Sequence, residues 1–143
     1  MGSTSLSERL RAAVRQTTEE SGRFKQLSGD SGISDASWRA WWYGRQRPTA
    51  EMIEAVCQHS PHYALWITTG VDAPRLGQEA ALGPYEDSLT GAEYPDLPEV
   101  RRYLALRVQA SKERTQGAIN LALANERLVM SELQHYYGVP DED

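Results

Sequence analysis

The sequence has few of the features that mark secreted or membrane proteins. Its single cysteine, Cys57, has no partner for an internal disulfide, and no apolar run approaches the roughly 20 residues that a transmembrane helix needs. Residues 1–5 lack the hydrophobic segment of a signal peptide. We therefore expect a cytoplasmic protein with no membrane contact, in which Cys57 is a buried, reduced thiol on an apolar helical face.

The sequence also lacks the residue constellations of common enzymes and metalloproteins. No Ser/His/Asp, Cys/His or paired-carboxylate arrangement has supporting context, and no glycine-rich phosphate loop is present. His59 and His62 have the spacing of a metal-binding pair, but Ser60-Pro61 between them is typical of a helix start and no third ligand is evident. We expect no catalytic residue, no metal and no cofactor.

An overall excess of positive charge, the usual footprint of a nucleic-acid binder, is missing as well. The formal net charge is -5 and the sequence pI is about 5.2. Residues 1–70 hold eight Lys/Arg and seven Asp/Glu (net +1), which leaves seven and thirteen (net -6) for residues 71–143. The acidity therefore belongs to the second half. In the first half, five cations cluster near one another in the sequence: Arg23, Lys25, Arg39, Arg45 and Arg47.

Residues 24–49 predict two short helices joined by a tight turn. Phe24 and Leu27 are three residues apart, as neighbours on one helical face are, and Gly32 follows where a left-handed turn needs a residue without a Cβ. Ser34 is placed to cap the next helix. The pattern favours a compact helix-turn-helix unit.

The second of these helices, residues 34–43, is predicted to be amphipathic. Trp38, Trp41 and Trp42 recur at three and four residues, so we expect them to share one buried face. Gly44 is positioned to end the helix as a left-handed cap. Four residues fall on the opposite, exposed face: Ala36, Arg39, Ala40 and Tyr43.

This stretch resembles the lambda-repressor-like (Xre/Cro) helix-turn-helix family. The family pattern Leu-Ala-x-x-x-Gly-Val-Ser is matched by Leu27-Ser28 and Gly32-Ile33-Ser34. The family's helix ending in Trp-x-x-Gly corresponds to Trp41–Gly44, and its basic Arg-x-Pro-Ser/Thr exit to Arg45-Gln46-Arg47-Pro48-Thr49. The resemblance implies a five-helix domain over about residues 6–70, which is half of the chain.

The match departs from the family pattern at three positions of the second helix. Trp38 stands where the family usually has Ile or Val, and Trp42 where it often has Glu. Asp35 begins the helix that reads bases in the family. These departures leave the preferred DNA sequence open.

The resemblance implies a sequence-specific transcriptional regulator that binds double-stranded DNA, a dimeric repressor of bacterial, phage or plasmid origin. Its helix 34–43 enters the major groove, with half-sites about 10 base pairs apart or a multiple of that. Arg39 is expected to pair with guanine, and Asp35 either to accept from cytosine or only to cap the helix. The implied base-reading residues are Asp35, Ala36, Ser37, Arg39 and Ala40. The implied phosphate-binding residues are Arg23, Lys25, Ser34, Tyr43, Arg45 and Arg47.

Flanking segments supply the remaining three helices of such a domain. Ser5 to Glu8 form a capping-box pattern, followed by an apolar stripe that ends at Val14. Thr49 precedes a second apolar helix pattern. Ser60-Pro61 begins the last helix, which ends at Gly70.

The second half predicts a linker and a helical oligomerisation segment. Residues 71–96 are rich in Pro, Gly and acidic residues and are assigned to the linker. Residues 97–137 carry one apolar stripe, as a long helix or as a hairpin divided at Gly117, and residues 138–143 form an acidic tail. The stripe consists of Leu97, Leu104, Val108, Ile119, Ala122, Val129, Leu133 and Tyr136. A single helix cannot bury its own stripe, so we expect a homodimer through residues 97–137.

Plainer interpretations remain open beside each of these. The domain could be a protein-binding adaptor that uses its acidic C-terminal helix on an unidentified protein partner and its helix-turn-helix only as a scaffold. Arg45 and Arg47 could be a solvated loop, and the C-terminal stripe could be intramolecular core. The predicted fold class is all-α: a five-helix lambda-repressor-like domain, a linker, and a long C-terminal helix or hairpin.

Overall fold

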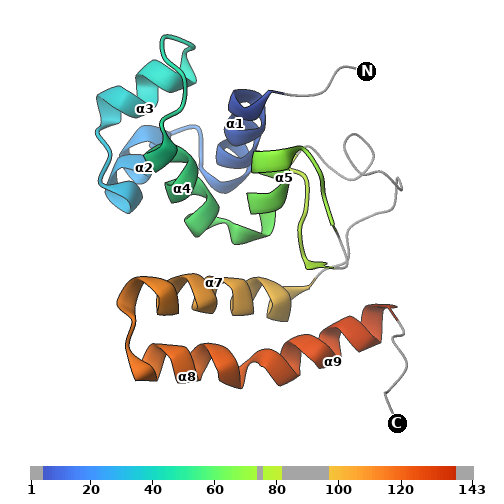
Figure 1. Cartoon of the computed structure of the whole chain (residues 1–143). Coiled ribbons are helices and arrows are strands. Elements are labelled where there is room, and N and C mark those ends of the chain that lie inside the picture. Colours follow the sequence, from blue (N-terminus) through green and yellow to red (C-terminus); the bar gives the residue numbers. More distant parts are fainter. Residues whose placement is uncertain (1–4, 74–75, 82–96, 138–143) are drawn as a thin grey trace.

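A computed structural model describes residues 5–73, 76–81 and 97–137 of the chain (Figure 1). Within these ranges the secondary structure is helical, apart from one isolated bridge between Ala73 and Gln78. A five-helix N-terminal region precedes the C-terminal helices, which confirms the all-α prediction at this level. None of the described helices is both long enough and apolar enough to cross a bilayer.

The first helix, α1 (Leu6–Thr17), begins at the predicted cap. The Ser5 Oγ accepts a hydrogen bond from the backbone N–H of Glu8 at 3.1 Å. Leu10 and Val14, one helical turn apart, are completely buried on its inner face. The apolar stripe thus fixes which side of α1 meets the rest of the region.

The next two helices are short and meet at a tight turn, as predicted. Helix α2 (Arg23–Ser31) ends at Gly32, whose φ is +75°, a value that favours glycine. Helix α3 (Asp35–Trp42) begins with the Ser34 hydroxyl as its cap, and the chain leaves it through Gly44 at φ +79°. Local signals alone therefore account for both ends of α3.

The rest of the N-terminal region consists of α4 (Ala50–His59), a 3-10 turn η1 (Pro61–Tyr63) and α5 (Ala64–Thr69). Thr49 caps α4 through its hydroxyl oxygen, as the sequence predicts. The fifth α-helix begins at Ala64, three residues later than the predicted start, because the proline opens a 3-10 turn first. Gly70, at φ +79°, ends it.

Tryptophan dominates the core between these helices. Two side chains from α3 and one from α5 are completely buried, and each contributes on the order of 150–250 Å² of buried surface. The largest fully buried side chains are Trp38, Trp41, Trp66, Leu10, Met52, Ile67 and Val14.

The C-terminal segment is a helical hairpin, α7 (Pro98–Glu113) followed by α8 (Gln116–Ala124) and α9 (Glu126–Tyr137). In Figure 1, α8 and α9 run back alongside α7. The reversal lies at Arg114–Thr115, where Arg114 adopts the left-handed conformation at φ +53°. The predicted division at Gly117 is therefore misplaced: this glycine lies inside α8, and the chain turns two to three residues earlier.

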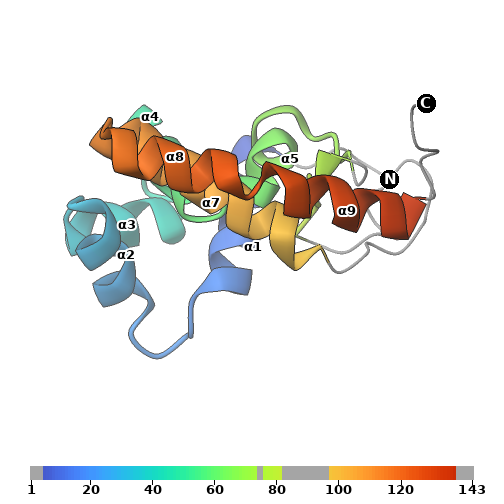
Figure 2. The ribbon, with the colours of Figure 1, turned by 90° about the horizontal axis from the view of Figure 1, so that it is seen from below.

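The hairpin is held together and docked by specific polar contacts. The Glu132 carboxylate of α9 accepts from the backbone N–H groups of Glu99 and Val100, at 3.1 and 2.9 Å, and so caps α7. Arg101 of α7 donates to both carboxylate oxygens of Glu79 at 2.9 and 2.8 Å. Because α7 also contacts η1 and α4, the hairpin packs beneath the N-terminal region (Figure 1), and in the view from below it lies in front of that region (Figure 2).

The predicted apolar stripe is divided between two environments. Ala122 is 1% exposed and lies toward α7, whereas Ile119, which was expected on the same face, is 37% exposed. Further apolar side chains of α8 and α9 that are about half exposed are Leu121, Leu123, Leu128 and Met130.

Candidate nucleic-acid interface

Two tryptophans fix the rotation of α3 about its own axis. The Trp38 indole N–H donates to the Ser31 Oγ of α2 at 3.1 Å, and the Trp41 indole N–H donates to the Ser7 Oγ of α1 at 2.9 Å. Buried indole donors need such partners, so each bond adds to the packing that surrounds its ring. One face of α3 is locked into the core, and the other necessarily faces outward at the edge of the molecule (Figure 1).

The outward face carries the residues predicted to read bases. Ala36 and Arg39 are exposed, and Tyr43 at the end of the helix is 63% exposed. Asp35, Ser37 and Ala40 are partly exposed on the same short helix. The structure therefore brings this predicted set together on one accessible surface.

Arg39 is held in place by two neighbours. Its Nε donates to the Asp35 Oδ1 at 2.6 Å, one helical turn away. Its guanidinium carbon lies 4.5 Å from the ring centroid of Phe24, at the start of α2. Because the bond to Asp35 uses Nε, both Nη groups keep their donors for a partner. Phe24 was not among the predicted site residues, since its spacing from Leu27 indicated only a packing role.

Asp35 does not cap α3, which corrects one of its two predicted roles. Ser34 caps α3, because its Oγ accepts from the backbone N–H of Ser37 at 3.1 Å. The Asp35 carboxylate instead pairs with Arg39, with both side chains about half exposed. The four-residue spacing of an acid and an arginine on a helix was the signal for this pair.

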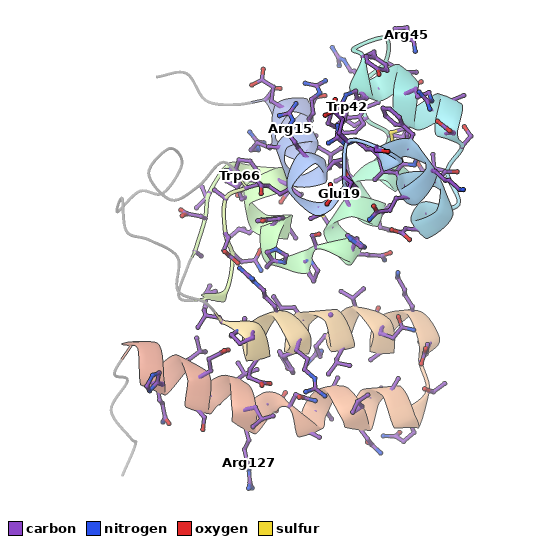
Figure 3. All side chains as sticks on the ribbon, turned by 180° about the vertical axis from the view of Figure 1, so that it is seen from behind. Arg15, Glu19, Trp42, Arg45, Trp66 and Arg127 are labelled. Carbon is purple, nitrogen blue, oxygen red and sulfur yellow. The ribbon has the colours of Figure 1, made fainter. Side chains whose placement is uncertain are left out.

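Four of the predicted phosphate-binding residues lie at the start of α2 or just after α3: Arg23, Lys25, Tyr43 and Arg45. Arg23 is the first residue of α2, and its Nε donates to the Thr18 Oγ1 at 2.9 Å. Lys25 is exposed on the same helix. Beyond α3, the Arg45 guanidinium lies 5.8 Å from the Tyr43 ring, at the outer tip of the loop to α4 (Figure 3). Two more predicted residues are placed nearby: Ser34, already engaged as the cap, and the exposed Arg47.

Trp42 departs from its predicted place. It was expected to be buried with the other two tryptophans, but it is only partly buried, between α1 and α2. Phe24 packs edge-on against it, with centroids 6.1 Å apart. Arginines of α1, Arg11 and Arg15, approach its ring together with Arg23. Sequence reasoning missed the two α1 arginines, whose four-residue spacing beside Leu10 and Val14 was the available signal.

Three acidic residues of the N-terminal region line a different surface. Asp30, Glu51 and Glu54 border a cleft of about 380 Å³ between α2, α4 and the end of α7, which contributes Lys112. His59 faces Asp30 across 4.0 Å at the same cleft. The arginines and Lys25 described above lie toward α2 and α3, whereas the carboxylates of this cleft lie toward the hairpin. The N-terminal region therefore has a basic face although its net charge is close to zero.

The two histidines of the possible metal pair lie close enough to influence each other electrostatically. His62 stacks on Tyr63 at 4.0 Å between centroids, and burial, together with Arg101 and His59, lowers the pKa of His62 to about 4. Across residues 5–73, 76–81 and 97–137, no three metal-ligating side chains gather.

No protein family, curated protein or solved structure matches this chain. Its interpretation therefore depends on the geometry of the face itself. That face offers a locked helix with one oriented guanidinium, small apolar side chains beside it, and further arginines on both sides. Such a surface is chemically suited to hold a polyanion and to contact hydrogen-bond acceptors between its charges.

Proposed function

We propose that the protein is a sequence-specific regulator of transcription that binds double-stranded DNA through a lambda-repressor-like helix-turn-helix formed by α2 and α3. One observation carries this proposal: Arg39 is held between Asp35 and Phe24 on the exposed face of a helix whose other face is locked by Trp38 and Trp41. An arginine oriented before binding is suited to base recognition, because less side-chain freedom is lost in the complex.

The proposed reading of bases follows from the chemistry of the outward face. The two Nη groups of Arg39 match the O6 and N7 acceptors of guanine in the major groove. Ala36 and Ala40 lie beside Arg39 and are small enough to meet thymine methyl groups. Asp35 acts mainly by positioning Arg39, and Ser37 supplies a hydroxyl at the edge of the same face.

Phosphate contacts would come from both ends of the two-helix unit. Arg23 and Lys25 stand at the start of α2, and Arg45 and Arg47 follow α3. Each phosphate contact displaces cations that are condensed on the DNA, so binding weakens as salt is added. The logarithm of the binding constant falls against the logarithm of the salt concentration with a slope of about 0.9 per phosphate contacted. The hairpin of α7, α8 and α9 is docked on the other side of α4 and leaves this face open.

We also propose that the regulator is a homodimer through the C-terminal hairpin. Leu121, Leu128 and Met130, on the surface of α8 and α9, are 47–56% exposed, an unusual density of apolar side chains for a free helix. A dimer would place two copies of α3 on successive major grooves, about 10 base pairs or a multiple apart.

The same exposed surface favours a second candidate function. A protein-binding adaptor would use α8 and α9 on an unidentified protein partner, and α2 and α3 only as structural elements. The two functions differ in one measurable property, because only the regulator retains duplex DNA in a salt-dependent way.

The decisive experiment is selection of a randomised duplex pool by the full chain at low and moderate salt, followed by sequencing. An enriched inverted repeat is expected for the regulator. Arg39→Ala should then relax the preference at one position of each half-site, at a cost of about 1–3 kcal/mol, whereas Arg102→Ala on α7 should leave the enriched sequence unchanged. If no duplex is retained at low salt, the adaptor function replaces the regulator.

A further inference from the structure

Three arginines surround a single indole ring at the edge of the candidate interface. The guanidinium carbons of Arg23, Arg15 and Arg11 lie 4.4, 5.4 and 5.9 Å from the centroid of the Trp42 ring. Arg11 is also 5.8 Å from the ring of Trp41. Two helices, α1 and α2, thus direct their cations to one aromatic side chain, which Figure 3 shows beside Arg15.

The cluster contains no ion pair of its own among the described residues. None of the three arginines forms an ion pair within the described part of the chain, although other arginines do, such as Arg39 with Asp35. All three groups lie within 6 Å of one ring centroid, so they repel one another while the indole attracts each of them. An anion that bridges the guanidinium groups would relieve this repulsion.

The indole also determines which anions fit. A guanidinium packed on a ring loses rotational freedom but keeps its N–H donors at the ring's rim, where they can reach an acceptor. Planar guanidinium groups bind the oxygens of phosphate in pairs. Trp42 packs against Phe24, which lies under Arg39, so a phosphate held there sits beside the groove that α3 is proposed to enter.

We infer that Arg11, Arg15 and Arg23, positioned by Trp42, form a clamp for a phosphodiester of the DNA backbone. The inference rests on the proposed function and adds to it a contact made by α1, outside the two helices of the motif. Trp42 is a positioning residue in this arrangement, and the arginines are the binding groups.

The salt dependence of binding to the selected duplex tests the clamp. Arg15→Gln and Arg23→Gln should each lower the slope of log K against log salt by about 0.9. Between 50 and 200 mM salt, the loss of affinity of each variant should therefore be roughly threefold smaller than the loss of the wild type. Affinity should fall equally for the selected duplex and for a random duplex. The matched control, Arg102→Gln on α7, removes the same charge and should keep the wild-type slope.

Two further variants separate charge from placement. Arg15→Lys keeps the charge, so the slope should stay near that of the wild type. Trp42→Leu removes the ring but no charge, so affinity should fall severalfold with the slope retained. Thermal unfolding of each variant shows whether the fold is intact, and Trp42→Tyr replaces Trp42→Leu if the latter does not fold.

The outcomes distinguish the clamp from the proposed function. If the wild type binds the duplex but neither glutamine variant changes the slope, the clamp is wrong and the regulator stands. If the wild type retains no duplex, the regulator itself is wrong. The last measurement adds inorganic phosphate at constant ionic strength as a competitor of duplex binding. If millimolar phosphate displaces the duplex while the glutamine variants keep the wild-type slope of log K against log salt, the cluster binds a free anion. The assignment of the cluster to the DNA backbone is then overturned.

Discussion

The sharpest prediction concerns Asp35, because its removal acts on Arg39 in two opposite ways. Asp35→Ala deletes a carboxylate near the proposed DNA surface, so binding to all duplexes should rise slightly. The same change frees Arg39, which keeps only Phe24 as a neighbour. Ordering such a side chain costs about 0.5–1.5 kcal/mol on binding, so discrimination between the selected duplex and one with the contacted guanine replaced should fall about 2- to 12-fold.

The stability of the fold should change little in the same variant. Both partners of the Asp35–Arg39 pair are about half exposed, and exposed helical pairs of this spacing contribute roughly 0.3–0.5 kcal/mol. Urea unfolding should therefore show a loss below about 1 kcal/mol, including the carboxylate's interaction with the start of α3.

Fluorescence anisotropy on the two duplexes is the assay, and Glu51→Ala is the matched control. Glu51 is also a carboxylate in the first turn of a helix, α4, but it lines the cleft toward the hairpin. The control should keep the discrimination of the wild type. The reasoning is refuted if Asp35→Ala retains the full discrimination, or if Glu51→Ala loses as much.

Three further predictions address the hairpin and the fold. Leu128→Glu should convert the proposed dimer to a monomer in light scattering, whereas Val71→Glu, an exposed apolar control outside the hairpin, should not. Gly77→Ala should lower the free energy of unfolding by about 1–3 kcal/mol, because a Cβ there would lie 2.3 Å from the Val100 Cγ1 and φ is +72°; an unchanged melting temperature would contradict this. The pKa of His62 is lowered to about 4 in the folded protein, below the ordinary 6.5. Between these two values the unfolded chain is protonated at His62 and the folded chain is not. The free energy of unfolding should therefore fall by about 1–3 kcal/mol as pH drops from 6.5 to 4. His62→Asn should flatten the profile in that window, and an equally steep profile would show that other groups cause it.

The helix ends could be predicted because their causes lie within a few residues. Ser5, Ser34 and Thr49 each cap the helix that follows, and Gly32 and Gly44 adopt the left-handed conformation that the turn requires. Such hydrogen bonds and backbone preferences need no partner from elsewhere in the chain. The burial of Trp38 and Trp41 followed in the same way from helical periodicity.

The turn of the hairpin could not be predicted from local preference. Glycine tolerates a left-handed conformation better than arginine does, which favoured a division at Gly117. The chain instead turns at Arg114, where a non-glycine residue at φ +53° costs roughly 1–2 kcal/mol. Packing of α7 against α8 and α9, including the Glu132 contacts with the start of α7, offsets that cost.

The sequence by itself determined the capped starts of α1, α3 and α4, the glycine ends of α2 and α3, and the burial of Trp38 and Trp41, because caps, glycines and apolar periodicity act over one or two turns. The tertiary structure decided what stands on the exposed side of α3. Phe24 under Arg39, and the α1 arginines around Trp42, come from helices separated in sequence by as many as 31 positions (Arg11 to Trp42). No local pattern specifies such a contact, since it depends on how three helices pack around a shared core.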